Sequence, residues 1–452
     1  MRVKNRETRI KMKQLFFLLT AVCFIISSCK KKDYEKAMSD PALYSNTVHE
    51  LNRVVMGNNF SPVVASRNYA YANVAAYEVI AAGDPAHYQS LCGQLNGLTS
   101  VAKPAKDAKI DFHYASILAF CKVGEAVTFP AGSMKQYVED LKAKAVNSGM
   151  PDEVLKGSEQ FADAMFKSIM KWSKGDNYAK TRGASKYALS DKEGRWVPTP
   201  PMYAEAVEPH WAEIRTMVMK DGKQYSVVPP PDFNIKDKNS KYYQEVIAIK
   251  NRRDSLTAEQ THIADFWDDN PGKLNVAGHL MFIKKKFSPA GHWMSITGIG
   301  AKQTNADFNT TVCAYAKTAI ALFDAFIECW GAKYTYNTVR PETIIDKYFD
   351  PTWRPHLQTP PFPEYTCGHC TISASAAKSL TSVFGENVAY ADTSELEFGI
   401  KSRSFKSFNQ AAAETAWSRF YGGIHFHNSC VVSSGYRQKV GDEVVKKLVM
   451  KK

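Results

Sequence analysis

Apolar residues recur every three to four positions along most of the chain, which is the spacing of one face of an α-helix. In residues 60–82, for example, Val64, Tyr71, Val74 and Val79 follow this spacing. The same style of pattern predicts helices over residues 107–128, 134–147, 151–174, 242–256, 257–266 and 275–287. Sustained alternation of apolar and polar residues, the mark of a half-buried strand, is hard to find. The pattern therefore predicts an all-α protein.

Two proline-rich segments interrupt the helical pattern. They are Trp196-Val-Pro-Thr-Pro-Pro and Val227-Val-Pro-Pro-Pro, and such runs break helices and central strands. We expect a helical bundle whose helices are joined by long irregular crossovers. We divide it into an N-terminal helical region, residues 30–300, and a C-terminal helical domain, residues 310–450.

Three helices are expected after residue 310. Apolar stripes run over residues 312–330, 372–384 and 411–421, and each is followed by glycine: Gly331, Gly385 and Gly422-Gly423. Glycine at these places is a C-terminal helix signal. The polar residues of chemical interest lie at the ends of these helices. Helix ends leave backbone groups unpaired, and N-terminal ends bind anions.

The N-terminus has the pattern of a bacterial lipoprotein signal. Lys11 and Lys13 precede a stretch from Leu15 to Ile26 that is apolar except for Thr20, and Ser-Ser-Cys29 follows. The stretch is too short to span a bilayer and fits the apolar part of a signal peptide. We expect residues 1–28 to be removed and Cys29 to be lipidated, which predicts a protein anchored in the bacterial cell envelope. A short uncleaved anchor is the alternative.

The net charge and the number of cysteines limit the classes of function that the chain can have. The formal net charge is +13, but much of the excess lies in residues 1–28, and the remaining charges are scattered. That distribution suits anionic small ligands and excludes a nucleic-acid-binding stripe. Beyond Cys29 the chain has seven cysteines, an odd and sparse set that predicts at most one or two disulfides.

Three segments of the C-terminal domain together supply three cations, two imidazoles and a glycine. They are Lys333-x6-Arg340-Pro341, Pro361-Phe-Pro-Glu-Tyr-Thr-Cys367-Gly368-His369 and Ser418-Arg419-x5-His425. Arginine forks and a lysine ammonium are natural partners for the oxygens of an oxyanion. One histidine can bind or attack the central atom while the other exchanges protons. We call these residues, Lys333, Arg340, Gly368, His369, Arg419 and His425, the oxyanion cage.

The order and spacing of these segments resemble the superfamily of type 2 phosphatidic acid phosphatases and vanadium haloperoxidases. Its motifs are Lys-x6-Arg-Pro, Pro-Ser-Gly-His and Ser-Arg-x5-His-x3-Asp. The resemblance implies that Lys333, Arg340 and Arg419 bind the equatorial oxygens, helped by the Gly368 N–H. It implies that His425 is the vanadate ligand or the phosphorylated nucleophile, and that His369 is the acid–base residue.

Two aromatic residues favour the haloperoxidase branch of this superfamily. Trp330 precedes Lys333 by three residues, and Phe362 precedes Cys367 by five. In haloperoxidases that this chain resembles, aromatic residues at both places line the peroxide and halide pocket. The chain also departs from the motifs twice. Cys367 stands where a serine binds an oxyanion oxygen, and Ser429 stands where an aspartate orients the histidine, so that partner is missing or comes from elsewhere.

Several other residues allow two interpretations. Cys367-Gly-His-Cys370 has the spacing of thiol oxidoreductases, although the surroundings read as helix; the two thiols could instead pair reversibly and gate the oxyanion loop. His279 and His292 fit core or loop positions better than metal sites. His427 is expected to face away from His425, and the Asp268-Asp269 pair is typical of a solvated loop.

The resemblance implies a vanadate-dependent haloperoxidase that oxidises halide with hydrogen peroxide, His369 assisting the proton transfers. A soluble phosphatase that acts on a phosphomonoester through phospho-His425 is the alternative, because vanadate imitates the phosphoryl transition state. A third possibility, suggested by Cys367 and Ser429, is an envelope lipoprotein that binds oxyanions without turnover. By resemblance alone, a homodimer is also expected.

Overall fold

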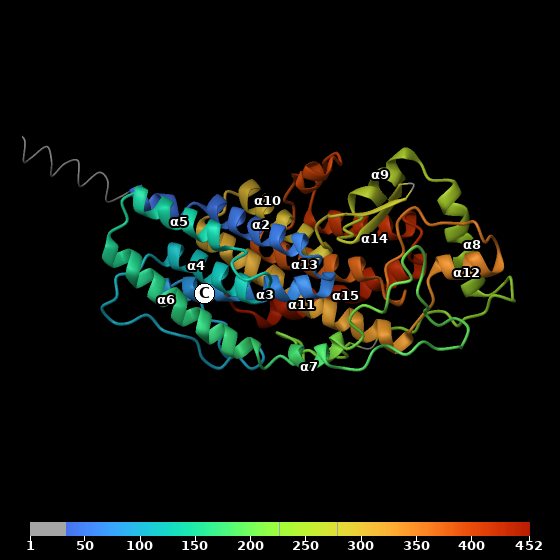
Figure 1. The fold of residues 1–452 in the computed structure, drawn as a ribbon, viewed down its shortest axis with the longest axis horizontal. Helices are drawn as coiled ribbons and strands as arrows, with labels where there is room; N and C mark the ends of the chain where they lie inside the picture. The colour runs from blue at the N-terminus through green and yellow to red at the C-terminus, as the bar shows by residue number, and fades with distance from the viewer. Residues whose placement is uncertain (1–32, 226, 278) are drawn as a thin grey trace, which may run out of the picture.

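The computed structural model describes residues 33–225, 227–277 and 279–452. Helices dominate this part of the chain (Figure 1), which confirms the all-α prediction. The helices are α2 (Pro41–Gly57), α3 (Pro62–Gly83), α4 (Phe112–Ala126), α5 (Lys135–Asn147), α6 (Asp152–Ser173), α7 (Tyr178–Arg182), α8 (Lys241–Asp254), α9 (Ala258–Phe266), α10 (Pro289–Gln303), α11 (Phe308–Tyr336), α12 (Pro341–Tyr348), α13 (Gly368–Phe384), α14 (Phe408–Tyr421) and α15 (His427–Lys447). Short 3-10 turns are η1 (Trp211–Glu213) and η2 (Ser394–Phe398).

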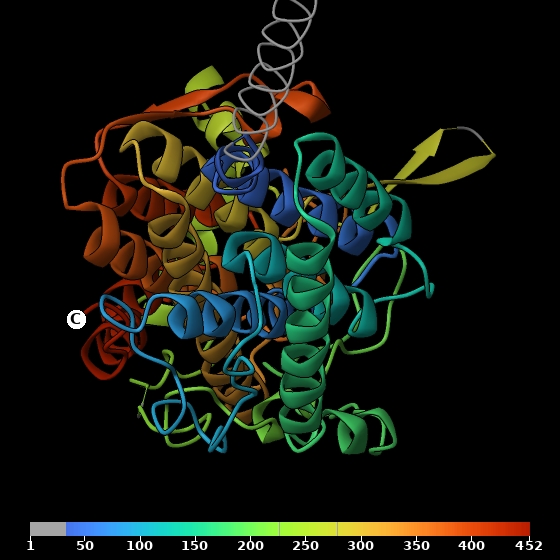
Figure 2. The ribbon, with the colours of Figure 1, turned by 90° about the vertical axis from the view of Figure 1, so that its left-hand side faces the viewer.

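Two antiparallel hairpins supplement the helices. In the first, β1 (Lys273–Ala277) pairs with β2 (Leu280–Lys284), and it projects from the helical body (Figure 2). In the second, β3 (Tyr390–Asp392) pairs with β4 (Arg403–Phe405). The first hairpin occupies most of the segment predicted as a helix over 275–287, so that prediction is wrong. Each strand has only five residues, which is too short to separate a period of two from a period of 3.6.

Helix α11 is the central element of the bundle. Its residues from Phe308 to Lys333 are buried almost without interruption, and it packs against α3, α10, α13 and α15 (Figure 1). A helix that is apolar on all sides is a core helix. One hydrophobic cluster runs from Tyr34 to Met450, so the two regions distinguished in the sequence share a core.

The end of α11 lies beyond the glycine expected to terminate it. Gly331 is inside the helix, where a side chain would collide with the backbone oxygen of Gly222. The helix ends instead at Asn337, which adopts a left-handed conformation with φ of 48° that asparagine tolerates better than most residues. This extension places Lys333 in the last turn, directed into the functional site.

The long crossover between α7 and α8 is tied to the core through buried acids. Asp324 of α11 accepts hydrogen bonds from the backbone N–H groups of Met217, Val218 and Met219, at 2.6, 2.8 and 3.0 Å. Asp176, buried after α6, accepts at its backbone oxygen from the N–H of Arg215 in the crossover at 2.9 Å, and its carboxylate pairs with Nε of Arg67 at 2.7 Å. These contacts hold the irregular, proline-rich crossover against the helices.

The predicted signal segment and Cys29 lie outside the described residues. Within the described part of the chain, no helix combines the length and apolarity needed to cross a membrane.

Candidate functional site

The ends of four helices converge on one buried site. Lys333 comes from the last turn of α11 and Arg340 caps the start of α12. Gly368 and His369 open α13, while Arg419 closes α14 and His425 lies just before α15. The structure thus brings together every residue of the predicted oxyanion cage, and all of them are buried except His369, which is partly buried. The loops that join these helices bring together residues that are up to 92 positions apart in the sequence.

His425 is held by an acid that the sequence did not single out. Its Nδ1 lies 2.9 Å from Oε1 of Glu364, which also accepts from the backbone N–H of Phe426 at 3.2 Å. The second carboxylate oxygen, Oε2, accepts from Oγ of Ser429 at 2.9 Å. The partner missing at Ser429 therefore comes from elsewhere, and Ser429 supports it. The signal available in the sequence was an acid three residues before Cys367 in the Gly-His segment.

The charges around His425 determine which form of its ring is stable. Burial, followed by the positive charges of Arg340 and Lys333, holds the pKa of His425 well below its usual value. The ring is therefore neutral at physiological pH. Because Arg340 can only donate hydrogen bonds, its 3.1 Å contact places the lone pair of the ring on Nε2 and the proton on Nδ1, toward Glu364. Histidine binds metals in this neutral form, and its second nitrogen is commonly fixed by a carboxylate.

Three cations surround Nε2 of His425. Nη1 of Arg340 lies 3.1 Å from it and also donates to the carbonyl of Ile424 at 2.8 Å. Nζ of Lys333 donates to the carbonyls of Pro363 and Glu364 at 2.8 and 3.0 Å.

Arg419 donates from Nη1 to the carbonyl of Trp267. Burial lowers the pKa of Arg340 to about 9, so this guanidinium remains charged at neutral pH. Three cationic side chains gathered at one buried place suit an anionic ligand.

Two guanidinium nitrogens of the cage indicate whether an anionic ligand fits there. Nη2 of Arg340 and Nε of Arg419 are buried and have no hydrogen-bond partner among the described residues. Buried donors are normally paired. Together with the neutral nitrogen of His425, they form the donor set that a histidine-bound vanadate requires. Vanadate therefore fits the residues present.

His369 faces an acid across the cage. Its Nε2 lies 3.6 Å from Oδ2 of Asp269, beyond hydrogen-bond range but close enough for charge interaction. Burial and the neighbouring Arg419 lower the pKa of His369 to about 4. Neutral at pH 7, it can accept a proton. Asp268 and Asp269 are both buried, so the prediction of a solvated loop is wrong: Lys273 and His292 pair with the two carboxylates.

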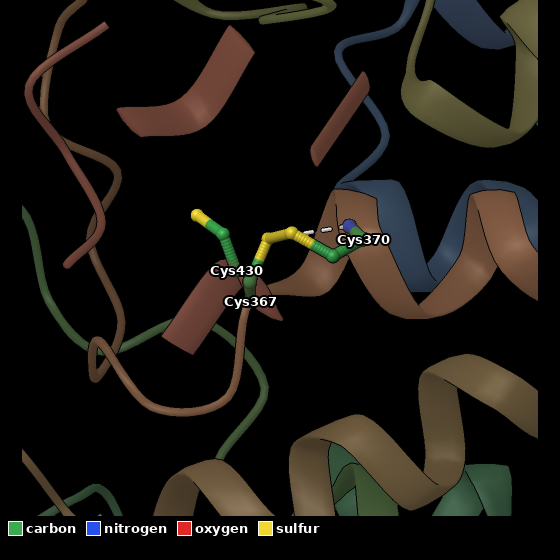
Figure 3. Close-up of side chains that lie close together, drawn as sticks. All are labelled: Cys367, Cys370 and Cys430. Carbon is green, nitrogen blue, oxygen red and sulfur yellow. Dashed lines mark hydrogen bonds between the residues drawn. A yellow bond between two sulfur atoms is a disulfide. The ribbon is translucent and has the colours of Figure 1, made fainter. Parts of the chain in front are cut away.

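Cys367 and Cys370 form a disulfide with a Cα–Cα distance of 5.4 Å, and Cys430 lies beside them (Figure 3). Cys367 caps α13, and its backbone N–H donates to Oγ of Ser433 at 3.0 Å. The sulfur of Cys367 thus has no hydrogen to donate to an oxyanion in this state. The predicted direct contact of this side chain would require the reduced form.

The cage opens into a cavity of about 270 Å³ with mainly apolar walls. Trp330 and Phe362 lie side by side on its wall, with ring centroids 4.9 Å apart. Gly368, His369, Arg419 and His425 line the same cavity, so both predicted aromatic residues are where a small substrate would approach the cage.

The other histidines fall outside the cage. His427 packs on Trp417, with centroids 5.0 Å apart, which agrees with the expectation that it faces away. His279 is exposed in the turn of the first hairpin. His292 is a fully buried core histidine between two carboxylates.

A protein-family model and solved structures of other proteins are similar to this chain. Residues 314–352 and 346–451 match the family model described as the VCPO second helical-bundle domain. The structure of a bacterial vanadium-dependent iodoperoxidase is similar with 39% sequence identity and a TM-score of 0.85, over 91% of this chain and 97% of that chain.

A holo-type bacterial vanadium-dependent chloroperoxidase shares the fold, with 14% identity and a TM-score of 0.60, over 86% of this chain and 93% of that chain. No curated protein sequence matches the chain significantly. The motifs, the geometry of the cage and the match over nearly the whole chain agree: this chain belongs to the vanadium-dependent haloperoxidase superfamily.

Proposed function

We propose that the chain is a vanadate-dependent haloperoxidase that oxidises a halide with hydrogen peroxide. The observation that carries this proposal is the state of His425. Its ring is neutral, Nδ1 is fixed by Glu364 at 2.9 Å, and Nε2 is turned toward buried cations. This is the arrangement of a histidine that binds an anionic metal centre.

Bound vanadate would supply an electrophilic centre that activates hydrogen peroxide toward halide. The residues of the chain would bind the vanadate and transfer protons. Nε2 of His425 would hold the vanadium, and the cage cations with the Gly368 N–H would hold its oxygens. His369, neutral at pH 7, would accept the proton released by peroxide and return it as hypohalous acid leaves. The apolar wall at Trp330 would limit the entry of bulk water.

Purified residues 30–452 provide the test. We expect halide oxidation that requires both vanadate and peroxide, with iodide tested first because the similar solved structure is an iodoperoxidase. His425→Ala should abolish the activity. His427→Ala is the matched control, because His427 packs on Trp417 away from the cage, and it should remain active. Full activity of His425→Ala would refute the assignment of the site.

The same preparation separates the other functions. Release of phosphate from p-nitrophenyl phosphate, with no halide oxidation, would mean that the cage serves a phosphatase. Vanadate binding without either activity would mean an oxyanion-binding protein. Both outcomes would contradict the proposed haloperoxidase.

We also propose that Cys29 anchors the protein in the bacterial cell envelope, on the strength of the sequence pattern alone. Mass spectrometry of the mature protein should find a diacylated or triacylated N-terminal cysteine. An unmodified N-terminus that retains residues 1–28 would contradict the proposal.

A further inference from the structure

Next to His369 lies a buried chain of charged groups centred on His292 of α10, and it reaches His369 through Asp269, which also lines the cavity. Nδ1 of His292 is 2.8 Å from Oδ1 of Asp269, and Nε2 is 3.0 Å from Oδ2 of Asp392. An ionised carboxylate only accepts hydrogen bonds. Both ring nitrogens must therefore carry hydrogen, which makes His292 an imidazolium. Its ring stacks on Trp267, with centroids 4.7 Å apart and planes at 23°.

The groups around His292 favour its positive charge. Glu395 lies 4.0 Å from Nδ1 and is itself paired with Lys286 at 3.5 Å. Both side chains are buried. Asp269 and Asp392 raise the pKa of His292 well above its usual value, although burial alone would lower it. Because both of its nitrogens donate to acids, His292 offers no lone pair to a metal ion, and the cluster is an ion-pair network.

Asp269 connects this network to the cage. Its Oδ1 receives the bond from His292, while Oδ2 faces Nε2 of His369 at 3.6 Å. Asp269 adopts a left-handed backbone with φ of 41° although it is not glycine. Such a conformation persists only where the surroundings enforce it. Neighbouring Asp268 pairs with Lys273 at 3.1 Å, so its carboxylate binds a different cation from that of Asp269.

We propose that His292 is a positioning residue for His369. Held by Asp392, its imidazolium orients the Asp269 carboxylate and offsets its charge, so that Asp269 steers the ring of His369 without drawing a proton onto it. The charged groups that face His369 are Asp268, Asp269 and Arg419. Of these, only Asp269 is bonded to His292. The inference rests on the proposed function, in which His369 must be neutral to accept a proton from peroxide.

Removing the charge of His292 has a definite expected sign. In His292→Gln, Asp269 loses its cationic partner, and His369 becomes the nearest group that can carry a positive charge. The pKa of His369 should then rise by at least one unit, roughly a tenfold increase in proton affinity. Asp269→Asn removes the acid itself, so the pKa of His369 should fall. General damage to packing is not expected to shift the pKa of His369 in opposite directions in these two variants.

The test is an NMR titration of the His369 ring in the vanadate-free protein, together with the pH profile of halide oxidation. In His292→Gln, the acid limb of that profile should move to higher pH by the same amount. The dissociation constant of vanadate, measured by equilibrium dialysis, should change less than about threefold, because the cage cations are untouched. The control is His279→Gln, which replaces an exposed histidine.

If His292→Gln does not fold, His292→Asn removes the same positive charge with a smaller side chain and should raise the pKa of His369 in the same direction. A folded variant whose His369 titrates as in the wild type would overturn the proposal. The titration does not depend on turnover. A protein without haloperoxidase activity would refute the proposed function, and the titration would still decide whether His292 governs His369.

Discussion

Glu364 and His425 form a buried pair, with 2.9 Å between the carboxylate Oε1 and the imidazole Nδ1. The same acid takes a hydrogen bond from Ser429, which occupies the position of the superfamily aspartate. The orienting carboxylate has thus moved from the helix that follows His425 to the loop that precedes α13, while its geometric role is preserved.

Glu364→Ala should weaken vanadate binding by about 10- to 100-fold, the usual effect of losing a group that orients a metal-binding histidine. Equilibrium dialysis at pH 7 measures the effect. Glu364→Gln keeps an acceptor for Nδ1 and should lose less affinity. Adding Ser429→Asp to Glu364→Ala should restore part of it, because Ser429 already lies beside the carboxylate. Equal affinity of Glu364→Ala and wild type would contradict the assigned role.

Arg340→Lys should reduce vanadate affinity by about tenfold or more. The guanidinium donates to the carbonyls of Phe362 and Ile424 and lies 3.1 Å from Nε2 of His425. An ammonium lacks the planar fork that makes these contacts at once. Arg354→Lys, at a side chain 49% exposed, is the control and should bind normally. Circular dichroism should confirm that both variants are folded before affinities are compared.

Reduction of the Cys367–Cys370 disulfide should change the activity of the wild-type enzyme, because the bond caps the first turn of α13 beside Gly368 and His369. Cys370→Ser should remove the response to reductant. Stability should change by only about 2 kcal/mol or less, since the closed loop is short. Cys92→Ser, at a thiol far from this turn in sequence and only partly buried, should respond like wild type. A wild type indifferent to reductant would rule out gating by this bond.

Asp324→Ala should lower the free energy of unfolding by about 3 kcal/mol or more. It leaves three buried N–H groups of the crossover without an acceptor, and each unpaired group costs about 1–3 kcal/mol. Urea denaturation measures the loss. Asp324→Asn retains an acceptor and should be less harmful. Identical effects of the two substitutions would mean that lost packing, not hydrogen bonding, is responsible.

The vanadate-free protein should lose stability as pH falls from about 6.5 to 4. The pKa of His369 is lowered to about 4 in the folded state, whereas an unfolded chain takes up that proton near pH 6.5. The unfolded state therefore binds more protons over this interval, and His369 accounts for about 3 kcal/mol of the loss. Comparing wild type with His369→Gln at both pH values isolates the effect. Parallel losses in the two proteins would contradict the lowered pKa.

Most of the cage could be predicted because its residues stand at fixed spacings within three short segments. Lys333 and Arg340 lie on either side of a helix end, and Arg419 and His425 flank another. Local geometry fixes these relationships once the helices are identified. Glu364 could not be identified in the same way, since it reaches His425 across 61 residues through the packing of two loops.

Two predictions from the sequence are wrong, each for its own physical reason. Asp268 and Asp269 look like exposed loop residues by composition, yet both are buried. Lys273 pairs with Asp268, and His292, 23 positions along the chain, pairs with Asp269. The segment predicted as a helix over 275–287 instead holds most of two strands that are each only five residues long, and so short a segment does not show a clear period.

The crossover that Asp324 ties to α11 also lines part of the cavity, through Thr199, Pro200, Met202 and Val207. The residues of the oxyanion cage come instead from α11 to α15 and the loops between them. This part of the cavity wall and the oxyanion cage therefore lie in separate stretches of the sequence. Randomising these four wall residues would change the shape of the cavity and leave every residue of the cage unchanged.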